Sequence, residues 1–260
     1  MDALASMSGF FELGCVEAYE TIDRVQHDAF GLGTASGTAL AEIGVYQGRS
    51  FLALTALRGR EEQCIAIDCF EEQDFNIDES GRGDLRKFTK NVRKFCDVVD
   101  GLLPTHVENG VPSFIKVIAG NSLDLKPSDI IGDGDAAIDV RMFSVDGSHT
   151  SEATLADLRL AEACSHEHGV IILDDCFNPD WPGCISGLSQ YLSQGGTFVP
   201  FCIGHNKVFL SCAADAPTYR RAFAAFTRKN AHLLGHECVV LKHGWIATFH
   251  ANDSVAARAV

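Results

Sequence analysis

Three aspartates and a histidine occupy positions from which they could act together in catalysis. Asp146 ends an apolar segment and is followed three residues later by His149, while Asp174 and Asp175 end the next apolar segment. The 28 residues from Asp146 to Asp174 are enough for one helical crossover between neighbouring parallel strands. Since such strands lie about 4.8 Å apart, we expect the three carboxylates to meet at one edge of a sheet.

Carboxylates at that separation repel one another and raise their own pKa values unless a cation lies among them. A hard divalent ion such as Mg²⁺ prefers oxygen ligands and fits this set better than zinc. We therefore predict a magnesium site at Asp146, Asp174 and Asp175, with His149 beside it as a candidate general base. Two plainer interpretations stay open: a helix N-cap with a solvated neighbour for the Asp174-Asp175 pair, and a surface loop histidine for His149.

A second motif, Glu42-Ile43-Gly44-Val45-Tyr46-Gln47-Gly48-Arg49-Ser50, joins a predicted strand to a predicted helix. Its two glycines would let the backbone approach a cofactor closely at the carboxyl edge of a sheet. They do not complete the dinucleotide pattern G-x-G-x-x-G, and a plain tight turn is the alternative interpretation.

Polar residues also end the next two predicted strands. Asp68 follows Gly44 by 24 residues, where a carboxylate can accept hydrogen bonds from the two hydroxyls of a ribose. Capping of the following segment is the alternative role for Asp68. Asn121 and Ser122 follow the third strand and carry small polar groups suited to flank an adenine.

The elements that would position these residues alternate between strand and helix. Short β-branched runs predict seven strands, at Ala39–Ile43, Cys64–Asp68, Ile115–Ala119, Met142–Asp146, Val170–Asp174, Phe198–Ile203 and Val208–Cys212. Apolar periodicity predicts helices at Phe10–Phe30, Ser50–Leu57, Asp84–Phe95, Ser151–Ser165, Gly183–Leu192 and Ala216–His232. The turn-length link Gly204-His205-Asn206-Lys207 indicates an antiparallel hairpin. The prediction is an α/β fold: a Rossmann-like αβα sandwich whose seven-stranded, mostly parallel sheet ends in that hairpin.

We divide the chain into an N-terminal helical extension, residues 1–37, and one domain, residues 38–260. The acidic stretch Phe70–Gly83 is predicted to be a long loop that covers a ligand at the end of the second strand. Phe177 and Trp181 follow the aspartate pair and either stack on an acceptor ring or pack beneath a loop.

Composition excludes several classes of protein. Lys and Arg number 21 against 35 Asp and Glu, for a formal net charge of -14, which disfavours nucleic acid and anionic lipid as partners. No apolar run approaches the roughly 20 residues of a membrane span, and the first residues lack the basic and apolar regions of a signal peptide, so we expect a cytoplasmic protein. The 10 cysteines lack metal-site spacing and are predicted to be buried, reduced thiols. Serine-hydrolase and P-loop motifs are missing.

Together, the Glu42-x-Gly44-x-x-x-Gly48-x-Ser50 turn, Asp68, Asp146-Gly147-Ser148-His149 and Leu173-Asp174-Asp175 resemble the motifs of class I methyltransferases that use S-adenosylmethionine (SAM). More narrowly, they resemble the Mg²⁺-dependent sugar O-methyltransferases of the macrocin type. The family pattern often reads Asp-Gly-Asp-His where this sequence has Ser148. The resemblance assigns SAM to Glu42, Gly44, Gly48, Ser50 and Asp68, and Tyr46, Asn121 and Ser122 complete our candidate set. It also assigns the metal to Asp146, Asp174 and Asp175, and the base to His149.

The resemblance implies SAM-dependent methylation of a small-molecule hydroxyl, on a sugar or another natural product, with Mg²⁺ as cofactor. A metal-independent small-molecule methyltransferase and a non-catalytic SAM-binding domain are the alternatives. An NAD-dependent oxidoreductase ranks last, because the first glycine of its fingerprint is missing. The N-terminal helix is a candidate contact in a homo-oligomer.

Overall fold

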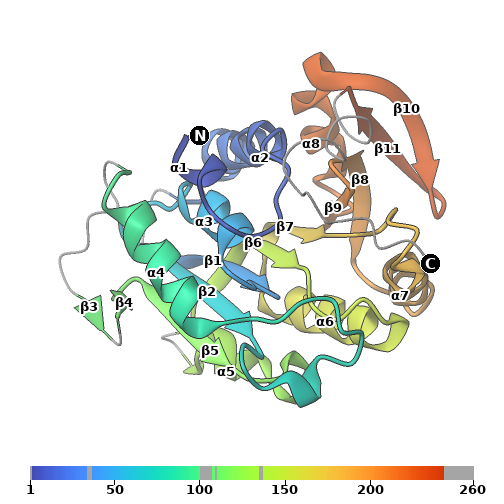
Figure 1. Cartoon of the computed structure of the whole chain (residues 1–260). Coiled ribbons are helices and arrows are strands. Elements are labelled where there is room, and N and C mark those ends of the chain that lie inside the picture. Colours follow the sequence, from blue (N-terminus) through green and yellow to red (C-terminus); the bar gives the residue numbers. More distant parts are fainter. Residues whose placement is uncertain (1, 34–36, 100–106, 109, 135–136, 243–260) are drawn as a thin grey trace, which may run out of the picture.

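A nine-stranded, mostly parallel sheet lies at the centre of the computed structural model, with helices on both faces (Figure 1). The structure describes residues 2–33, 37–99, 107–108, 110–134 and 137–242. The strands follow the order β10-β11-β8-β9-β7-β6-β1-β2-β5. This arrangement confirms the predicted Rossmann-like αβα sandwich.

The bounds of the elements are as follows. The central strands are β1 (Thr38–Ile43), β2 (Gln63–Asp68), β5 (Ile115–Ala119), β6 (Asp139–Val145), β7 (Ser165–Leu173), β8 (Phe198–Gly204), β9 (Lys207–Cys212), β10 (Thr227–Leu233) and β11 (His236–Leu241). A separate small hairpin consists of β3 (Val107–Glu108) and β4 (Val111–Pro112). The α-helices are α1 (Asp2–Ala5), α2 (Cys15–Phe30), α3 (Arg49–Thr55), α4 (Leu85–Cys96), α5 (Pro127–Ile131), α6 (Ser151–Cys164), α7 (Pro182–Ser193) and α8 (Ala216–Ala222). Short 3-10 helices are η1 (Gln73–Phe75), η2 (Ser122–Asp124) and η4 (Ala224–Phe226).

Five neighbouring strands, β5, β2, β1, β6 and β7, run parallel to one another. Their carboxyl ends therefore lie along one edge of the sheet, where the segments that follow them can meet. Antiparallel β9 pairs with both β7 and β8, which confirms the predicted hairpin. The topology thus brings the loops after β1, β2, β5, β6 and β7 together at the edge where open α/β sheets bind ligands.

Two apolar cores cover the two faces of the sheet, because successive residues of a strand point to opposite sides. In β1, Leu40 contributes to one core, while Ala39 and Ala41 contribute to the other. The first core receives buried side chains from α2, α3, α4 and α8, and the second receives them from α5, α6 and α7. Fully buried Phe51 and Leu158 represent the two sides.

The prediction of seven strands is wrong, because the chain forms a second hairpin where we expected a long helix. Helix α8 ends at Ala222, and β10 and β11 follow as an antiparallel pair. Leu234 and Gly235 both have positive φ, at 49° and 89°, which is the backbone of a two-residue hairpin turn. Strand β11 then pairs in parallel with β8 and buries Val239 against the core, and this long-range pairing overrides local helix propensity.

The predicted N-terminal helix begins at Cys15 instead of Phe10, and it ends as expected before Gly31, whose φ of 69° closes the last turn. Helix α2 packs into the first core through Tyr19 and Ile22. The boundary at residue 37 stays a proposal, and the tail 243–260 of the predicted domain lies outside the described residues. Within the described part of the chain, no helix has the length and apolar character to span a membrane.

Candidate active site

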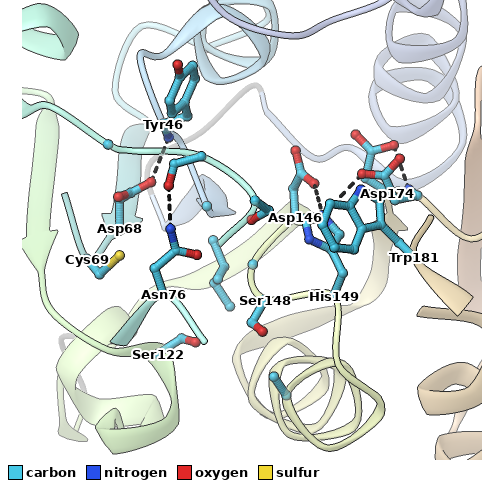
Figure 2. Close-up of a pocket in the computed structure, with 18 of the residues that line it drawn as sticks. Tyr46, Asp68, Cys69, Asn76, Ser122, Asp146, Ser148, His149, Asp174 and Trp181 are labelled. Atoms are coloured by element: carbon cyan, nitrogen blue, oxygen red, sulfur yellow. Dashed lines mark hydrogen bonds and ion pairs between the residues drawn. The ribbon is translucent and has the colours of Figure 1, made fainter. Parts of the chain in front are cut away.

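A cavity of about 550 Å³ opens at the carboxyl edge of the parallel strands. Figure 2 shows side chains from the ends of β1, β2, β5, β6 and β7 around it. Nine predicted site residues line the cavity: Gly44, Tyr46, Asp68, Asn121, Ser122, Asp146, His149, Asp174 and Asp175. The topology therefore brings the two predicted groups, cofactor and metal, into one space.

The glycine turn after β1 requires glycine for a steric reason. Gly44 has a φ of 82°, and a Cβ there would lie 1.7 Å from the carbonyl oxygen of Asp146. Gly48 has a φ of 91° and precedes α3, where a Cβ would meet the Phe88 ring at 2.9 Å. Gly44 borders the cavity, whereas Gly48 packs beneath the turn and is outside the lining.

Glu42 and Ser50 also lie beneath the turn and not in the cavity lining. Buried Glu42 accepts hydrogen bonds on Oε1 from Ser50 Oγ at 2.7 Å and from Ser144 Oγ at 3.1 Å. Burial raises the pKa of the Glu42 carboxyl to about 8, and repulsion from Asp146 adds to the rise. These contacts tie the turn to α3 and β6, so both residues are placed to shape the turn from below.

Asp68 holds the glycine turn next to its own loop. Its Oδ2 accepts a hydrogen bond from the backbone N–H of Tyr46, and its Oδ1 accepts one from the backbone N–H of Phe70, both at 2.6 Å. Burial raises the pKa of Asp68, while these two hydrogen bonds oppose the rise. Each carboxylate oxygen can accept a further hydrogen bond, so Asp68 retains capacity for ribose hydroxyls in the cavity that it lines.

The segment after β5 lines the cavity next to Asp68, on the side predicted to bind the cofactor. Gly120 donates its N–H to the carbonyl oxygen of Asp68 at 2.9 Å, which brings Asn121 and Ser122 into the lining. Asn121 is engaged in its own turn, because its Oδ1 accepts the N–H of Leu123 at 3.2 Å. Ser122 begins η2.

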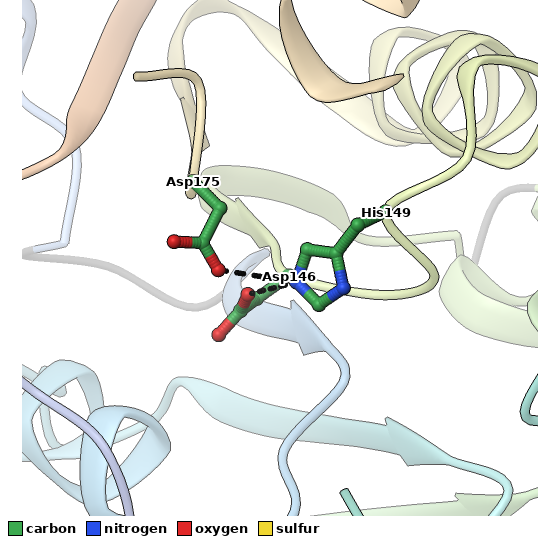
Figure 3. Close-up of side chains that lie close together, drawn as sticks. All are labelled: Asp146, His149 and Asp175. Carbon is green, nitrogen blue, oxygen red and sulfur yellow. Dashed lines mark ion pairs between the residues drawn. The ribbon is translucent and has the colours of Figure 1, made fainter. Parts of the chain in front are cut away.

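The predicted convergence of the acidic residues is observed. The backbone N–H of Asp174 donates to the carbonyl oxygen of Val145 at 3.0 Å, so the ends of β6 and β7 are direct neighbours. Asp146, His149 and Asp175 offer ligand atoms that all lie within 4.8 Å of one another. Figure 3 shows the two carboxylates facing the imidazole ring. The two carboxylates of this cluster suit a hard divalent cation, and the imidazole lies beside them.

His149 lies at the centre of this cluster. Its Nε2 is 3.1 Å from Asp175 Oδ2 and 3.7 Å from Asp146 Oδ1, and its Nδ1 is 2.6 Å from Asp78 Oδ2. The Trp181 ring stacks on the imidazole at a centroid distance of 4.5 Å (Figure 2). Burial lowers the pKa of His149, but the three carboxylates outweigh it and raise the value to about 11. In this arrangement His149 is protonated on both ring nitrogens and carries a positive charge.

Asp174 has a partner that the sequence analysis missed. Buried Lys207, the first residue of β9, forms an ion pair with the Asp174 carboxylate. The antiparallel register places Val208 opposite Leu173, so Lys207 necessarily lies beside Asp174. Burial nevertheless raises the pKa of Asp174 to about 7. The three carboxylates of the predicted metal site are therefore not uncompensated, because Lys207 supplies one positive charge among them.

A net negative charge remains even so. Four carboxylates, those of Asp78, Asp146, Asp174 and Asp175, surround His149 and Lys207. When His149 and Lys207 each carry a positive charge, the four carboxylates leave two negative charges, which a divalent cation would balance. The carboxylates that converge beside His149 are those of Asp146 and Asp175, since Asp174 is engaged by Lys207. Asp175 is itself held by side-chain amides, because its Oδ1 accepts hydrogen bonds from Asn178 Nδ2 at 3.0 Å and from Asn206 Nδ2.

The N-terminal segment before α2 also contributes to the cavity, although we predicted helix from Phe10 onward. Phe10, Phe11 and Glu12 line the cavity, and the Phe10 ring stacks on Tyr46 at 5.7 Å. Glu12 Oε2 lies 2.9 Å from His205 Nδ1. These residues belong to the non-helical segment between α1 and α2.

The two aromatic residues after the aspartate pair have different roles. Both pack partly buried against the second core, but only Trp181 also lines the cavity and stacks on His149. The predicted burial of cysteines holds for eight of the ten, with Cys69 and Cys212 partly exposed.

Solved structures share this fold at low sequence identity. Apo CalS11, a TDP-rhamnose 3'-O-methyltransferase of calicheamicin biosynthesis, has a TM-score of 0.52 and 15% identity over 77% of this chain and 81% of its own. The O-methyltransferase NovP has a TM-score of 0.53 and 16% identity over 75% and 79%. An O-methyltransferase from Bacillus cereus in complex with SAH has a TM-score of 0.50 and 13% identity over 80% and 85%.

No curated protein matches the sequence significantly. A family model described as a methyltransferase domain matches residues 41–176, just over half of the chain, and this range extends from the glycine turn to the aspartate pair. The protein therefore belongs to this methyltransferase family and is a class I SAM-dependent methyltransferase.

Proposed function

We propose that the protein transfers the methyl group of SAM to a hydroxyl of a small-molecule acceptor, such as a sugar, with the help of Mg²⁺. One observation carries the proposal: Asp68 and the glycine turn border the same cavity as the Asp146, His149 and Asp175 cluster. A methyl donor on the first group would thus face an acceptor at the second. The structural neighbours CalS11 and NovP are O-methyltransferases, which supports transfer to oxygen.

The cofactor side of the cavity would hold SAM through Asp68 and the backbone around Gly44. Asp68 is the candidate ribose ligand, and Tyr46, Asn121 and Ser122 border the same side of the cavity. Glu42, Gly48 and Ser50 would act from beneath, by fixing the turn. SAM supplies an electrophilic methyl group on a sulfonium, so the protein must mainly orient the two reactants.

At the acceptor side, Asp146 and Asp175 would hold the metal, with Asp174 kept in place by Lys207. The metal would supply Lewis-acid chemistry, lowering the pKa of an acceptor hydroxyl and offsetting the carboxylate charge that keeps His149 protonated. His149 would then be free to accept the hydroxyl proton at Nε2, the ring nitrogen that faces Asp146 and Asp175.

A metal-independent methyltransferase is the second candidate, and Lys207 is the observation that favours it. Buried and directed at Asp174, this ammonium places a permanent positive charge in the cavity lining. It could stabilise a developing alkoxide without a metal.

The test is methyl transfer from labelled SAM to a panel of sugar nucleotides, glycosides and catechols. We expect methylated product with at least one hydroxyl acceptor in the presence of Mg²⁺. The rate should fall about tenfold or more in EDTA and recover when Mg²⁺ is added back. Turnover that is indifferent to EDTA would select the metal-independent candidate. SAM binding without turnover on any acceptor would favour a non-catalytic SAM-binding domain.

A further inference from the structure

The acidic loop of residues 70–83 contacts the candidate base directly. Asp78 Oδ2 lies 2.6 Å from the backbone nitrogen of His149 and 2.6 Å from its ring Nδ1. The two side chains are only 6% and 9% exposed. The loop after β2 thus forms a buried, two-point contact with the motif after β6, 71 positions further along the chain.

Asp78 is held in its own loop by the other carboxylate oxygen. Its Oδ1 accepts the backbone N–H of Ser80 at 3.1 Å. Asn76 closes the same loop, donating to Gln73 Oε1 at 2.9 Å and to the carbonyl oxygen of Gly81. Because the loop is bonded internally, the position of Asp78 is coupled to that of the whole segment.

This segment also borders the cofactor side of the cavity. Phe75 and Ile77 line the cavity and are 40% and 60% exposed. At the end of the loop, a Cβ on Gly83 would lie 2.6 Å from Asp68 Oδ1, so the chain returns to the candidate ribose ligand. One loop therefore reaches Asp68 at one end and His149 in its middle.

We propose that Asp78 is a positioning residue, which orients the His149 ring and couples closure of residues 70–83 over the cavity to assembly of the catalytic cluster. Engagement of Nδ1 by Asp78 leaves Nε2 directed at Asp146 and Asp175, at 3.7 and 3.1 Å. Without that acceptor the ring is held only by the Trp181 stack and by the carboxylates that face Nε2. The catalytic part of this inference rests on the proposed methyl transfer, whereas the coupling of loop and ring does not.

Hydrogen–deuterium exchange on the intact protein tests the coupling. Asp78→Ala and His149→Ala each remove one side of the contact, and we expect amides in residues 70–83 to exchange about tenfold faster in both, since a charge-assisted hydrogen bond of this kind is lost. The double variant should exchange no faster than Asp78→Ala alone, because that substitution already removes both hydrogen bonds of the contact. Glu79→Gln is the matched control, because it removes the same charge from the adjacent residue, which is outside the cavity lining. Wild-type exchange rates in Asp78→Ala would overturn the proposal.

Steady-state kinetics test the positioning role. In Asp78→Ala, kcat should fall about 10- to 100-fold with the KM for SAM within about threefold, as for the loss of other groups that orient a catalytic histidine. Asp78→Asn keeps an oxygen acceptor at the same distance and should recover most of kcat. A rise in the KM for SAM with an unchanged kcat would show that residues 70–83 only cover the cavity, and it would overturn the positioning role of Asp78. If the wild-type protein neither binds SAM nor turns over, the proposed function fails, while the exchange result still decides the coupling.

Discussion

At the residue scale, the charge on His149 depends on what neutralises the carboxylates around it. Asp78, Asp146 and Asp175 raise its pKa to about 11, so it holds a proton when no further cation is near. Lys207 does not relieve this, because it is engaged by Asp174. To act as a base, His149 therefore needs a further cation, in addition to Lys207, at Asp146 and Asp175. The base role of His149 thus depends on the proposed metal.

Replacing His149 with alanine should slow methyl transfer without abolishing cofactor binding. We expect kcat to fall about 10²- to 10⁴-fold, the usual contribution of a general base, with the Kd for SAM changed less than about threefold. Rates are measured with saturating acceptor and Mg²⁺, and affinity by calorimetry. His232→Ala is the control, because it removes an exposed histidine from edge strand β10. Wild-type turnover in His149→Ala would remove this residue as the base.

Asp157 should make the protein less stable as pH rises. This carboxyl on α6 is buried, and burial raises its pKa from 3.8 to about 7, although the Ser122 hydroxyl opposes the effect. A folded-state pKa above the unfolded one gives stability that is complete below pH 3.8 and is lost progressively up to about pH 7. Asp157→Asn should remove this loss, worth roughly 2–4 kcal/mol in the free energy of unfolding.

The measurement is urea unfolding of wild type and Asp157→Asn from pH 4 to pH 8. The exposed Asp180→Asn serves as the control and should follow the wild type throughout. Parallel pH profiles for wild type and Asp157→Asn would show that Asp157 is not the group responsible.

The site residues could be predicted to the extent that they follow parallel strands. Asp146, Asp174 and Asp175 were found because strand ends of known spacing must meet at one edge. Lys207 was missed because its place depends on an antiparallel register, which strand spacing alone does not reveal. Asp78 was missed because loop conformation, and not periodicity, brings it to His149.

At the element scale, the strands of the parallel half could be predicted and the last hairpin could not. β1 and β2 are largely buried segments rich in apolar residues, and β5 is apolar except for Lys116, so their sequences read as strands regardless of their partners. In β10 five of the seven residues are polar and none is buried, and the strand exists because β11 pairs with it. Its sequence carries little of the apolar alternation by which strands are recognised.

A buried ion pair ties helix α2 to the sheet. The Arg141 side chain is 0% exposed, and its Nε contacts Glu62 Oε1 at 2.6 Å while its Nη1 contacts Asp23 on α2 at 2.9 Å. Arg141 also donates to the Gln26 side chain at 2.8 Å. This network makes α2 a structural part of the fold.

Arg141→Met should therefore lower the free energy of unfolding by about 3–5 kcal/mol, because it leaves the Glu62 carboxylate buried and unpaired. The measurement is urea denaturation at pH 7. Lys87→Met, which breaks an exposed pair with Asp84, should cost less than about 1 kcal/mol. Equal losses in the two variants would contradict the structural role of the network.

At the scale of the whole molecule, one cavity joins the cofactor turn, the acidic cluster and the loop of residues 70–83. The acidic balance of the chain, with a net charge of -14, agrees with a cavity that favours cations and neutral acceptors over anionic ones. Removal of a divalent metal should leave the negative charge of the cavity uncompensated.

Mg²⁺ should bind the protein in the absence of any acceptor, because Asp146 and Asp175 are already together. We expect saturable binding by calorimetry, weakened about tenfold or more by Asp175→Asn and left nearly unchanged by Asp180→Asn. Asp174→Asn should have the smaller effect of the two adjacent substitutions, since Lys207 engages that carboxylate. Identical affinity in Asp175→Asn and wild type would exclude the cluster as the metal site.

The most direct test of the account is calorimetric titration of the wild-type protein and Asp68→Ala with SAM. We expect micromolar binding by the wild type, weakened about tenfold or more in Asp68→Ala, which loses the candidate ribose ligand. Glu71→Ala, a change of an exposed acid in the same segment, should bind like the wild type. Absence of SAM binding by the folded wild-type protein, or equal affinity in Asp68→Ala, would contradict the account.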